Sequence, residues 1–464
     1  MRIEYRSTRG QSPNLPFKEA VLTGLAPDGG LYLPNLIPQL STGMLGRFRN
    51  LSYADLAFEV ITRFIDDDSI DQQTLRQIIY DSYASFRHPE VAPLRHLHDD
   101  IFLLELFHGP TLAFKDFALQ FLGRLLAHYF AQSGKPAVVL GATSGDTGSA
   151  AIAGFAGRPN MDIFILHPKG RVSDVQRRQM TTAADSNVYN IALEGTFDDC
   201  QDIVKAIFSD ADFRAKHTLI AVNSINWARI LAQVVYYIYA ALKLGAPDTQ
   251  VNFCVPTGNF GDIYAGHVAR QMHLPIGKLI IATNQNDILK RTLDTGVYSM
   301  GGVSPTLSPS MDIQISSNFE RLLFDLHRGD ATLIAQKMAR FRKEKQLELT
   351  EEAHAWFQAQ FSAGSADDNT TLAAIEQVYG HTGVLLDPHT AVGYAVAAQA
   401  PTEGPKVVLA TAHPAKFPDA VQQAAGIHPE LPGHMHDLFE REERYDVQLN
   451  DAQKVKQFID SHTA

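Results

Sequence analysis

The sequence is poor in cysteine and has no long apolar run. Only Cys200 and Cys254 occur among 464 residues, so no disulfide framework can form, and no paired Cys/His spacing predicts a zinc site. The longest apolar stretch, residues 234–242, is too short to span a bilayer. The first residues also lack the apolar segment of a signal peptide. We therefore expect a cytoplasmic protein with no metal site and no membrane partner.

The sequence also has no excess of positive charge. Its net charge at pH 7 is −11, whereas binding to a phosphate backbone needs a basic face, so we expect no nucleic-acid partner. The apolar content of 45% and the charged content of 20% are typical of an ordinary globular protein. A chain of 464 residues is too long for one simple core, so more than one domain is expected. This net charge and this composition do not exclude a small anionic substrate in a local pocket.

Apolar strands and helical segments alternate over much of the chain. Short apolar runs at 137–140, 162–166 and 251–255 each precede a loop, and a long helix is expected from about Trp227 to Leu244. This alternation predicts doubly wound parallel sheets of the α/β class. We expect an N-terminal region (1–95), an α/β core (96–288, with a smaller α/β subdomain at about 116–215), a mainly helical insertion (289–380), a return to the large domain (381–432) and a C-terminal tail (433–464).

Lys115 follows apolar and small residues and opens a helical pattern. Residues 101–107 are apolar enough for a buried strand, so the lysine is expected at a strand–loop–helix junction. The helix-end potential and desolvation both disfavour an ammonium there, which makes the amine more nucleophilic, as Schiff-base chemistry needs. By itself, such a lysine is more often a helix-start residue with its charge in water. Other motifs must decide between the two interpretations.

Two glycine-rich loops each follow an apolar strand and precede a helical segment. Small residues at 141–149 leave backbone N–H groups free for an anion at the helix start, but no lysine follows the glycines, which disfavours a nucleoside triphosphate. Residues 256–262 place two glycines around one asparagine, which suits a nest of N–H donors for phosphate. The absence of a Gly-x-Gly-x-x-Gly pattern argues against a dinucleotide. Either loop can also be a plain structural turn.

Two further stretches carry polar side chains at expected junctions. In residues 222–229, Arg229 can hold a phosphate or a carboxylate in a bidentate manner. In residues 409–418, Thr411 follows a strand at its carboxyl end, where ligands bind in open α/β sheets. A helix cap with a surface arginine, and a solvated Lys416, are the alternative interpretations.

Together, the lysine segment 107–116 and these four stretches resemble the threonine synthases. These belong to the pyridoxal-phosphate enzymes that share the tryptophan-synthase β-subunit fold. The resemblance covers most of the chain, from residues 5–9 to residues 412–417, and the helical insertion is typical of the longer bacterial and fungal branch. It implies fold type II: two doubly wound parallel-sheet domains with the cofactor between them, plus an N-terminal region and a helical insertion. We expect a monomer or a weak homo-oligomer.

The resemblance also implies roles for matching residues. Lys115 would be the catalytic residue and form a Schiff base with pyridoxal 5'-phosphate, and Thr411 would face the pyridine nitrogen. Related folds often have asparagine where this chain has Asp146. The implied cofactor-binding residues are Lys115, Asp146, Gly258, Asn259, Phe260, Gly261, Asp262 and Thr411. The implied substrate-binding residues are Thr143, Ser144, Gly145, Asp146, Thr147, Asn223, Ser224, Asn226, Arg229 and Lys416.

The implied activity is that of a carbon–oxygen lyase of threonine biosynthesis. It would convert a small-molecule substrate, O-phospho-L-homoserine, with water into L-threonine and phosphate by β,γ-replacement. The amine of Lys115 would take protons from Cα and Cβ, phosphate would leave Cγ, and water would add at Cβ. Three alternatives stay open: another enzyme of this fold, such as a dehydratase or a β-replacing synthase; a non-catalytic ligand-binding relative; and a phosphate-binding protein that uses the glycine loops alone.

Overall fold

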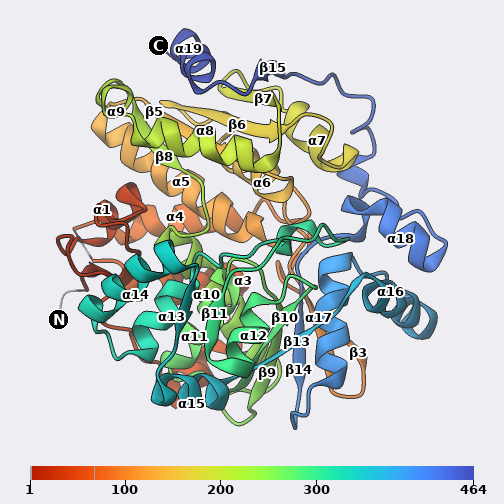
Figure 1. Ribbon diagram of the computed structural model, residues 1–464. Coiled ribbons are helices and arrows are strands. Elements are labelled where there is room, and N and C mark those ends of the chain that lie inside the picture. The colour runs from red at the N-terminus through yellow and green to blue at the C-terminus, as the bar shows by residue number, and fades with distance from the viewer. Residues whose placement is uncertain (1–2, 67, 464) are drawn as a thin grey trace.

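The chain forms two α/β units, each built on its own sheet, in the computed structural model (Figure 1). The structure describes residues 3–66 and 68–463. Residues 1–2, which belong to the N-terminal segment where no signal peptide is expected, lie outside the described residues. The unit with the smaller sheet occupies the upper part of Figure 1, and the N-terminal segment lies beside the lower unit. Among the helices of the described ranges, none combines the length and the apolar character needed to cross a bilayer.

The larger sheet has six strands and carries the lysine segment. Neighbouring strands run parallel, except that β3 is antiparallel to β4. The predicted α/β class with parallel sheets is therefore confirmed. The order across the sheet is β13 (Phe361–Ser365), β10 (Ile276–Thr283), β9 (Val251–Pro256), β14 (Lys406–Ala410), β4 (Ile101–Glu105) and β3 (Leu94–His98).

The smaller sheet has five parallel strands, and two antiparallel pairs lie outside both sheets. Its order is β15 (Asp446–Leu449), β7 (Val188–Glu194), β6 (Met161–Pro168), β5 (Ala137–Ala142) and β8 (Thr218–Ala221). The pairs are β1 (Tyr5–Ser7) with β2 (Tyr32–Pro34), and β11 (Val297–Ser299) with β12 (Gln346–Glu348).

Two edge strands come from segments in which no sheet strand was expected. β13 lies inside the predicted helical insertion, and β15 lies inside the predicted tail. Both are short, and neither has the apolar run of a buried central strand. Edge strands have one neighbour only, so a weak apolar pattern is sufficient for them. The predicted domain limits stay predictions.

Alternate residues of the larger sheet face two different helical layers. Val407 and Leu409 of β14 belong to the core cluster that also contains α11 (Gly261–Gln271) and α10 (Trp227–Lys243). Val408 points the other way, into the cluster of α17 (Pro388–Gln399), because successive side chains of a strand lie on opposite faces.

The helix α10 joins the two units. It packs against α11 on the larger sheet and against α5 (Lys115–Ser133), which in turn packs against α6 (Asp146–Phe155) of the smaller unit. Nearly every residue of α10 is buried, as a helix between two layers requires. The predicted long helix that begins at Trp227 is confirmed.

The remaining helices cover the outer faces of both units. They are α1 (Phe17–Thr23), α2 (Thr42–Phe48), α3 (Tyr53–Ile61), α4 (Gln72–Tyr83), α7 (Asp174–Thr181), α8 (Phe197–Ser209), α9 (Ala211–Lys216), α12 (Ile288–Thr295), α13 (Phe319–Leu326), α14 (Ala331–Glu344), α15 (Glu351–Gln360), α16 (Asp368–Thr382), α18 (Pro418–Ala425) and α19 (Ala452–His462). The 3-10 helices are η1 (Thr62–Phe64), η2 (Pro309–Met311), η3 (Pro414–Lys416) and η4 (Gly433–Met435).

Candidate active site

Lys115 is the first residue of α5, at the strand–loop–helix junction that the sequence predicted. The segment before it is hydrogen-bonded to the segment after β14. Phe114 N–H donates to the carbonyl of Thr411 over 2.9 Å, and His413 N–H donates to the carbonyl of Leu112 over 3.0 Å. Because β4 and β14 are parallel neighbours, both segments leave the sheet at its carboxyl edge, where ligands bind in open α/β sheets.

Asp116 closes the lysine segment into a tight turn. Its carboxyl group accepts hydrogen bonds from the Thr111 N–H, over 2.8 Å, and from the Thr111 hydroxyl, over 2.7 Å. A Cβ at Gly109 would lie 2.5 Å from this carboxyl group, so the turn requires glycine. Burial raises the pKa of Asp116 to about 6, although the bonds from Thr111 favour its charged form.

The amine of Lys115 is almost completely removed from water. Its side chain is 11% exposed, and its Nζ lies 3.5 Å from Oδ2 of Asp146. Burial lowers the pKa of Lys115, Asp146 opposes that change, and the charges of Lys416 and Arg229 lower the pKa further. The net direction is downward, so this amine loses its proton more readily than an exposed lysine does. Nucleophilic attack and proton transfer both need such an amine.

Asp146 begins α6, and its carboxylate contacts two buried side chains. Its Oδ1 lies 3.0 Å from the ammonium of Lys416, and Gln176 Nε2 donates to the same oxygen over 2.8 Å. Burial alone would raise the pKa of Asp146, but the charges of Lys416 and Lys115 hold it well below its usual range. Asp146 is therefore an anion at neutral pH.

The loop before α6 uses one hydroxyl internally and leaves two without a partner. Thr143 Oγ1 accepts hydrogen bonds from the N–H groups of Gly145 and Gly148, both over 2.9 Å. Within residues 3–66 and 68–463, the half-buried hydroxyls of Ser144 and Thr147 have no hydrogen-bond partner. This loop can therefore offer two hydroxyls and the N-terminal end of a helix to an anion.

The loop before α11 presents consecutive backbone donors. The N–H groups of residues 258–261 have no acceptor in the described part of the chain. Phe260 has a left-handed backbone, with φ at 63°, and such a conformation turns neighbouring N–H groups to one side. A Cβ at Gly258 would lie 2.8 Å from the carbonyl oxygen of Ser310, so no larger residue fits there without a shift. This set of donors suits a phosphate group.

Asp262 lies in the first turn of α11, next to the same loop. It accepts hydrogen bonds from the hydroxyls of Tyr236 and Tyr237, the latter over 2.9 Å. Among the described residues, its Oδ2 has no partner. Burial raises the pKa of Asp262 to about 6, while the two tyrosines and the charge of Lys115 act in the opposite direction. Asp262 therefore takes up a proton much more readily than Asp146 does.

Arg229 and Asn226 differ in how far their side chains are already hydrogen-bonded. Arg229 is buried and donates from Nη1 to the carbonyl of Val222 over 3.0 Å, while its Nε has no partner in the described residues. Burial lowers the pKa of Arg229 to about 10. Asn226 is the N-cap of α10: its Oδ1 accepts from Ala228 N–H, and its Nδ2 donates to the carbonyl of Val21. Its amide is therefore already engaged in holding the helix start.

Ser224 lies beside the loop that precedes α11, and Asn223 is exposed. The hydroxyl of Ser224 is 3.2 Å from that of Ser317, which also donates to Asn259 Oδ1. Asn318 Nδ2 donates to the carbonyls of both Ser224 and Asn259. The structure thus brings Ser224 close to the loop before α11, whose N–H groups suit a phosphate, whereas Asn223 faces solvent.

Residues at the start of α17 hold Thr411 in place, although the sequence predicted no role for them. Its N–H donates to the hydroxyl of Thr390 over 3.2 Å, and this hydroxyl donates to Asp387, the N-cap of α17. His389 contacts Asp387 through Nδ1 over 2.9 Å and accepts from Ser310 N–H through Nε2. The only local signal was an aspartate before a proline, which is also typical of any helix start.

Gln176 is the other site residue without a predicted role. It lies in α7, donates to Asp146 and is buried. Its surroundings in the sequence are polar and show no motif, so no local pattern could have indicated it.

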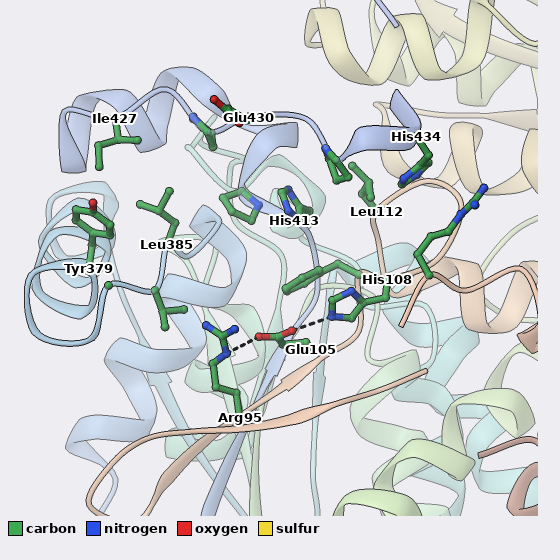
Figure 2. A pocket seen from close by; sticks show the side chains of 17 residues that line it. Arg95, Glu105, His108, Leu112, Tyr379, Leu385, His413, Ile427, Glu430 and His434 are labelled. Carbon is green, nitrogen blue, oxygen red and sulfur yellow. Dashed lines mark hydrogen bonds and ion pairs between the residues drawn. The ribbon is translucent and has the colours of Figure 1, made fainter. Parts of the chain in front are cut away.

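A cavity of about 520 Å³ borders the lysine segment but does not include Lys115 (Figure 2). Glu105 lies on its wall between Arg95, 2.9 Å away, and His108, 2.8 Å away. His413 lines the same cavity, and burial and the neighbouring His108 lower the pKa of His413 to about 4. The imidazole of His413 is therefore neutral at pH 7 and accepts a hydrogen bond from Ala415 N–H.

Three family models match the chain. Residues 4–83 match "Threonine synthase N terminus", residues 87–341 match "Pyridoxal-phosphate dependent enzyme", and residues 390–459 match "Threonine synthase, C-terminal". Among curated proteins, the chain is 51% identical to a threonine synthase of Pseudomonas aeruginosa, with 99% of this chain and 98% of that protein covered. It is 44% identical to a threonine synthase of Saccharomyces cerevisiae, with 90% and 88% covered.

Solved structures agree with the sequence matches. A pyridoxal-phosphate-bound threonine synthase from Brucella melitensis is 51% identical and superposes with a TM-score of 0.97, with 99% of each chain covered. Threonine synthase from yeast is 41% identical, with a TM-score of 0.94 over 99% of this chain and 98% of that chain. The chain thus has the fold of these two solved threonine synthases.

Proposed function

Because the chain belongs to the threonine synthase family, we propose that it converts O-phospho-L-homoserine and water to L-threonine and phosphate. This is a carbon–oxygen lyase reaction of threonine biosynthesis, and its cofactor is pyridoxal 5'-phosphate. The single observation that carries the proposal is the buried amine of Lys115, which lies 3.5 Å from Asp146 after one anion-type loop and whose charge acts on Asp262 after the other.

The residues around Lys115 fit this cofactor. The four free N–H groups of residues 258–261 would hold its phosphate, because they lie at a helix start and lack acceptors in the described chain. Lys115 would bind its aldehyde carbon, and Thr411 would face its ring nitrogen. A neutral hydroxyl at Thr411 would leave that nitrogen largely unprotonated. When bound, the ring withdraws electrons from the substrate's α-carbon.

The chain's own residues would orient the substrate and move its protons. The hydroxyls of Ser144 and Thr147 would donate hydrogen bonds to the α-carboxylate at the start of α6, because they have no other partner in the described chain. The amine of Lys115 would remove the protons of Cα and Cβ, and phosphate would leave Cγ. Water would then add at Cβ, and Cγ and Cα would be reprotonated. A lysine amine with a lowered pKa suits these repeated transfers near neutral pH.

A second phosphate site, separate from that of the cofactor, is needed for the substrate's own phosphate. We assign Arg229 and Ser224 to it, with Asn223 and Asn226 as further candidates from the sequence. Arg229 supports this assignment because its Nε has no partner among the described residues and its charge acts on Lys115. Asn226 has the weakest support, because its amide already caps α10.

We further propose a cytoplasmic enzyme that is a monomer or a weak homo-oligomer and does not bind nucleic acid. The net charge of −11 supports the last point. The free and buried thiols of Cys200 and Cys254 fit a reducing compartment. Light scattering of the purified protein over a range of concentrations would measure the oligomeric state.

The direct test is incubation of the purified protein with O-phospho-L-homoserine and assay of phosphate and threonine. We expect equal amounts of both products. Lys115→Ala should lower the rate by at least about 10³-fold, because the group that moves the protons is lost. Lys135→Ala, at an exposed lysine outside the site, is the matched control and should be fully active. Release of phosphate without threonine, or turnover by Lys115→Ala, would contradict the proposal.

A further inference from the structure

Lys416 is a lysine with no exposed surface and with three polar partners. Its Nζ lies 3.0 Å from Oδ1 of Asp146, 2.6 Å from the carbonyl of Thr111 and 3.0 Å from Oε1 of Gln179. Its ammonium group donates hydrogen bonds to Thr111 and Gln179, and its charge is paired with Asp146. Because the side chain has no exposed surface, a phosphate group on the substrate would have to displace one of these partners before it could reach Lys416.

The partners of Lys416 belong to three different segments around the site. Thr111 is in the lysine segment, Gln179 is in α7 and Asp146 begins α6. Gln179 Nε2 also donates to the carbonyl of Thr111 over 3.1 Å, which closes the arrangement. Lys416 itself ends the 3-10 helix η3 that follows β14. One buried charge therefore joins the lysine segment to the smaller unit.

The two oxygens of Asp146 are directed to different partners. Oδ1 faces Lys416 and Gln176, while Oδ2 faces Lys115 at 3.5 Å. With Oδ1 held by a hydrogen bond and an ion pair, the carboxylate has little freedom to rotate, and Oδ2 stays beside the reactive amine. If Lys416 were absent, one of these two anchors would be lost.

We propose that Lys416 is a positioning residue that fixes the Asp146 carboxylate beside Lys115, and that it does not bind the substrate's phosphate. The inference deepens the proposed function and rests on it for the identity of the substrate. It assigns Lys416 a role through Asp146 in place of the direct substrate contact that the sequence predicted.

The effect of Lys416 on Lys115 has two opposite components. As a neighbouring positive charge, Lys416 disfavours a proton on the nitrogen of Lys115; as the anchor of Asp146, it favours that proton by keeping a negative charge nearby. Removal of the charge alone would raise the pKa of the lysine nitrogen, whereas loss of the anchored carboxylate would lower it. The other charged or titratable groups that act on this cluster are Asp116 of α5, Arg229 of α10, His389 of α17, Asp262 of α11 and His413 before η3.

The visible absorbance of the bound cofactor reports the protonation of the lysine nitrogen, so its pH titration separates the two components. We expect Lys416→Met to lower the spectroscopic pKa by about one unit or more, as Asp146→Asn should. The double variant should titrate like Asp146→Asn alone, because residues that act through one another are not additive. An unchanged or raised pKa in Lys416→Met would overturn the proposal. Lys406→Met, at a lysine that is buried at the other end of β14, is the matched control.

A second measurement tests the phosphate contact directly. The inhibition constant of inorganic phosphate and the KM for O-phospho-L-homoserine should both change by less than about threefold in Lys416→Met and in Lys416→Arg. The arginine variant keeps the charge and carries this test if the methionine variant does not fold. A loss of phosphate affinity of tenfold or more in either variant would show a direct contact and overturn the proposal.

The two proposals can fail separately. If the wild-type protein forms no threonine, the proposed function is wrong, but the spectroscopic titrations still decide the role of Lys416. If the wild-type protein is active and Lys416→Met titrates at or above the wild-type pKa, only the positioning role is wrong.

Discussion

The loops before α6 and α11 place the same kind of residue in the same local position, with opposite results. Asp146 and Asp262 each lie in the first turn of a helix, are buried and act on Lys115. Asp146 has a pKa well below the usual range despite its burial, because two lysines surround it. Burial raises the pKa of Asp262 to about 6, because its hydrogen-bond partners are uncharged tyrosines.

The difference shows that distant segments, and not the local motif, set the protonation of each carboxyl group. A helix start favours a carboxylate in both loops. The charge of Lys416 outweighs burial in one case, whereas the tyrosine hydroxyls of α10 only partly offset burial in the other. Lys115 consequently lies near one permanent anion and one acid that titrates near neutral pH. Sites in which two carboxyl groups have pKa values that are far apart can assign different roles to them.

The largest expected effect on stability is that of Asp146→Asn. The substitution leaves the buried ammonium of Lys416 without its ion-pair partner, which typically costs about 3–5 kcal/mol of unfolding free energy. Because the folded-state pKa of Asp146 is depressed, its contribution is present above the unfolded-state pKa and is lost as the pH falls. The deficit of Asp146→Asn should therefore be full at pH 8 and smaller in acid, as denaturant unfolding would measure. Equal stability of the wild type and Asp146→Asn at pH 8 would contradict the difference drawn between Asp146 and Asp262.

The sequence predicted the scaffold of both loops well. Alternating apolar strands and helical segments indicated the parallel sheets, and the helix starts at Lys115 and Trp227 are confirmed. These features depend on local periodicity and on small residues at turns, which can be read along the chain. The edge strands β13 and β15 escaped prediction because a strand with one neighbour needs little apolar character.

The contacts around Lys115 were less accessible to sequence reasoning. The sequence indicated the 141–149 and 409–418 stretches separately, but not that Lys416 of one reaches Asp146 of the other. Gln176, Asp387 and His389 carry no motif of their own. Their positions follow from how the two units pack, which is a property of the whole chain and not of any local pattern.

The opposite pH dependence is expected for Asp262→Asn. The folded-state pKa of about 6 lies above the ordinary aspartate pKa of 3.8, so the wild-type protein gains this residue's contribution in acid and loses it as the pH rises through 6. A difference of about two pKa units corresponds to roughly 3 kcal/mol. Relative to the wild type, Asp262→Asn should therefore gain stability by up to this amount between pH 4 and pH 8.

Denaturant unfolding at both pH values would measure this change for Asp262→Asn and Asp146→Asn in parallel. From pH 4 to pH 8, Asp262→Asn should gain stability relative to the wild type. The deficit of Asp146→Asn should stay nearly constant over this range, because it shrinks only below the unfolded-state pKa of about 4. Parallel curves for the two variants would remove the distinction between the two loops.

The smallest expected effect is that of Gly258→Ala, which tests whether the loop before α11 binds through its backbone while the loop before α6 binds through side chains. The loop before α6 depends on the charge of Asp146, whereas the loop before α11 depends on N–H groups that only a glycine at position 258 leaves in place. A Cβ there would lie 2.8 Å from the carbonyl oxygen of Ser310, which is backbone and cannot swing away. Gly258→Ala should weaken pyridoxal-phosphate affinity about tenfold, or 1.4 kcal/mol, because overpacking shifts the donors.

Titration of the cofactor-free protein with pyridoxal phosphate, followed by absorbance, would measure the effect of Gly258→Ala. Gly43→Ala is the control, because a Cβ at Gly43 in α2 would meet no atom within 4 Å. The pH dependence of stability in Gly258→Ala should stay like that of the wild type, since the charges around Asp146 and Asp262 are untouched. Unchanged cofactor affinity would mean that side chains, and not the backbone of residues 258–261, hold the phosphate, and the contrast between the two loops would then be one of charge alone.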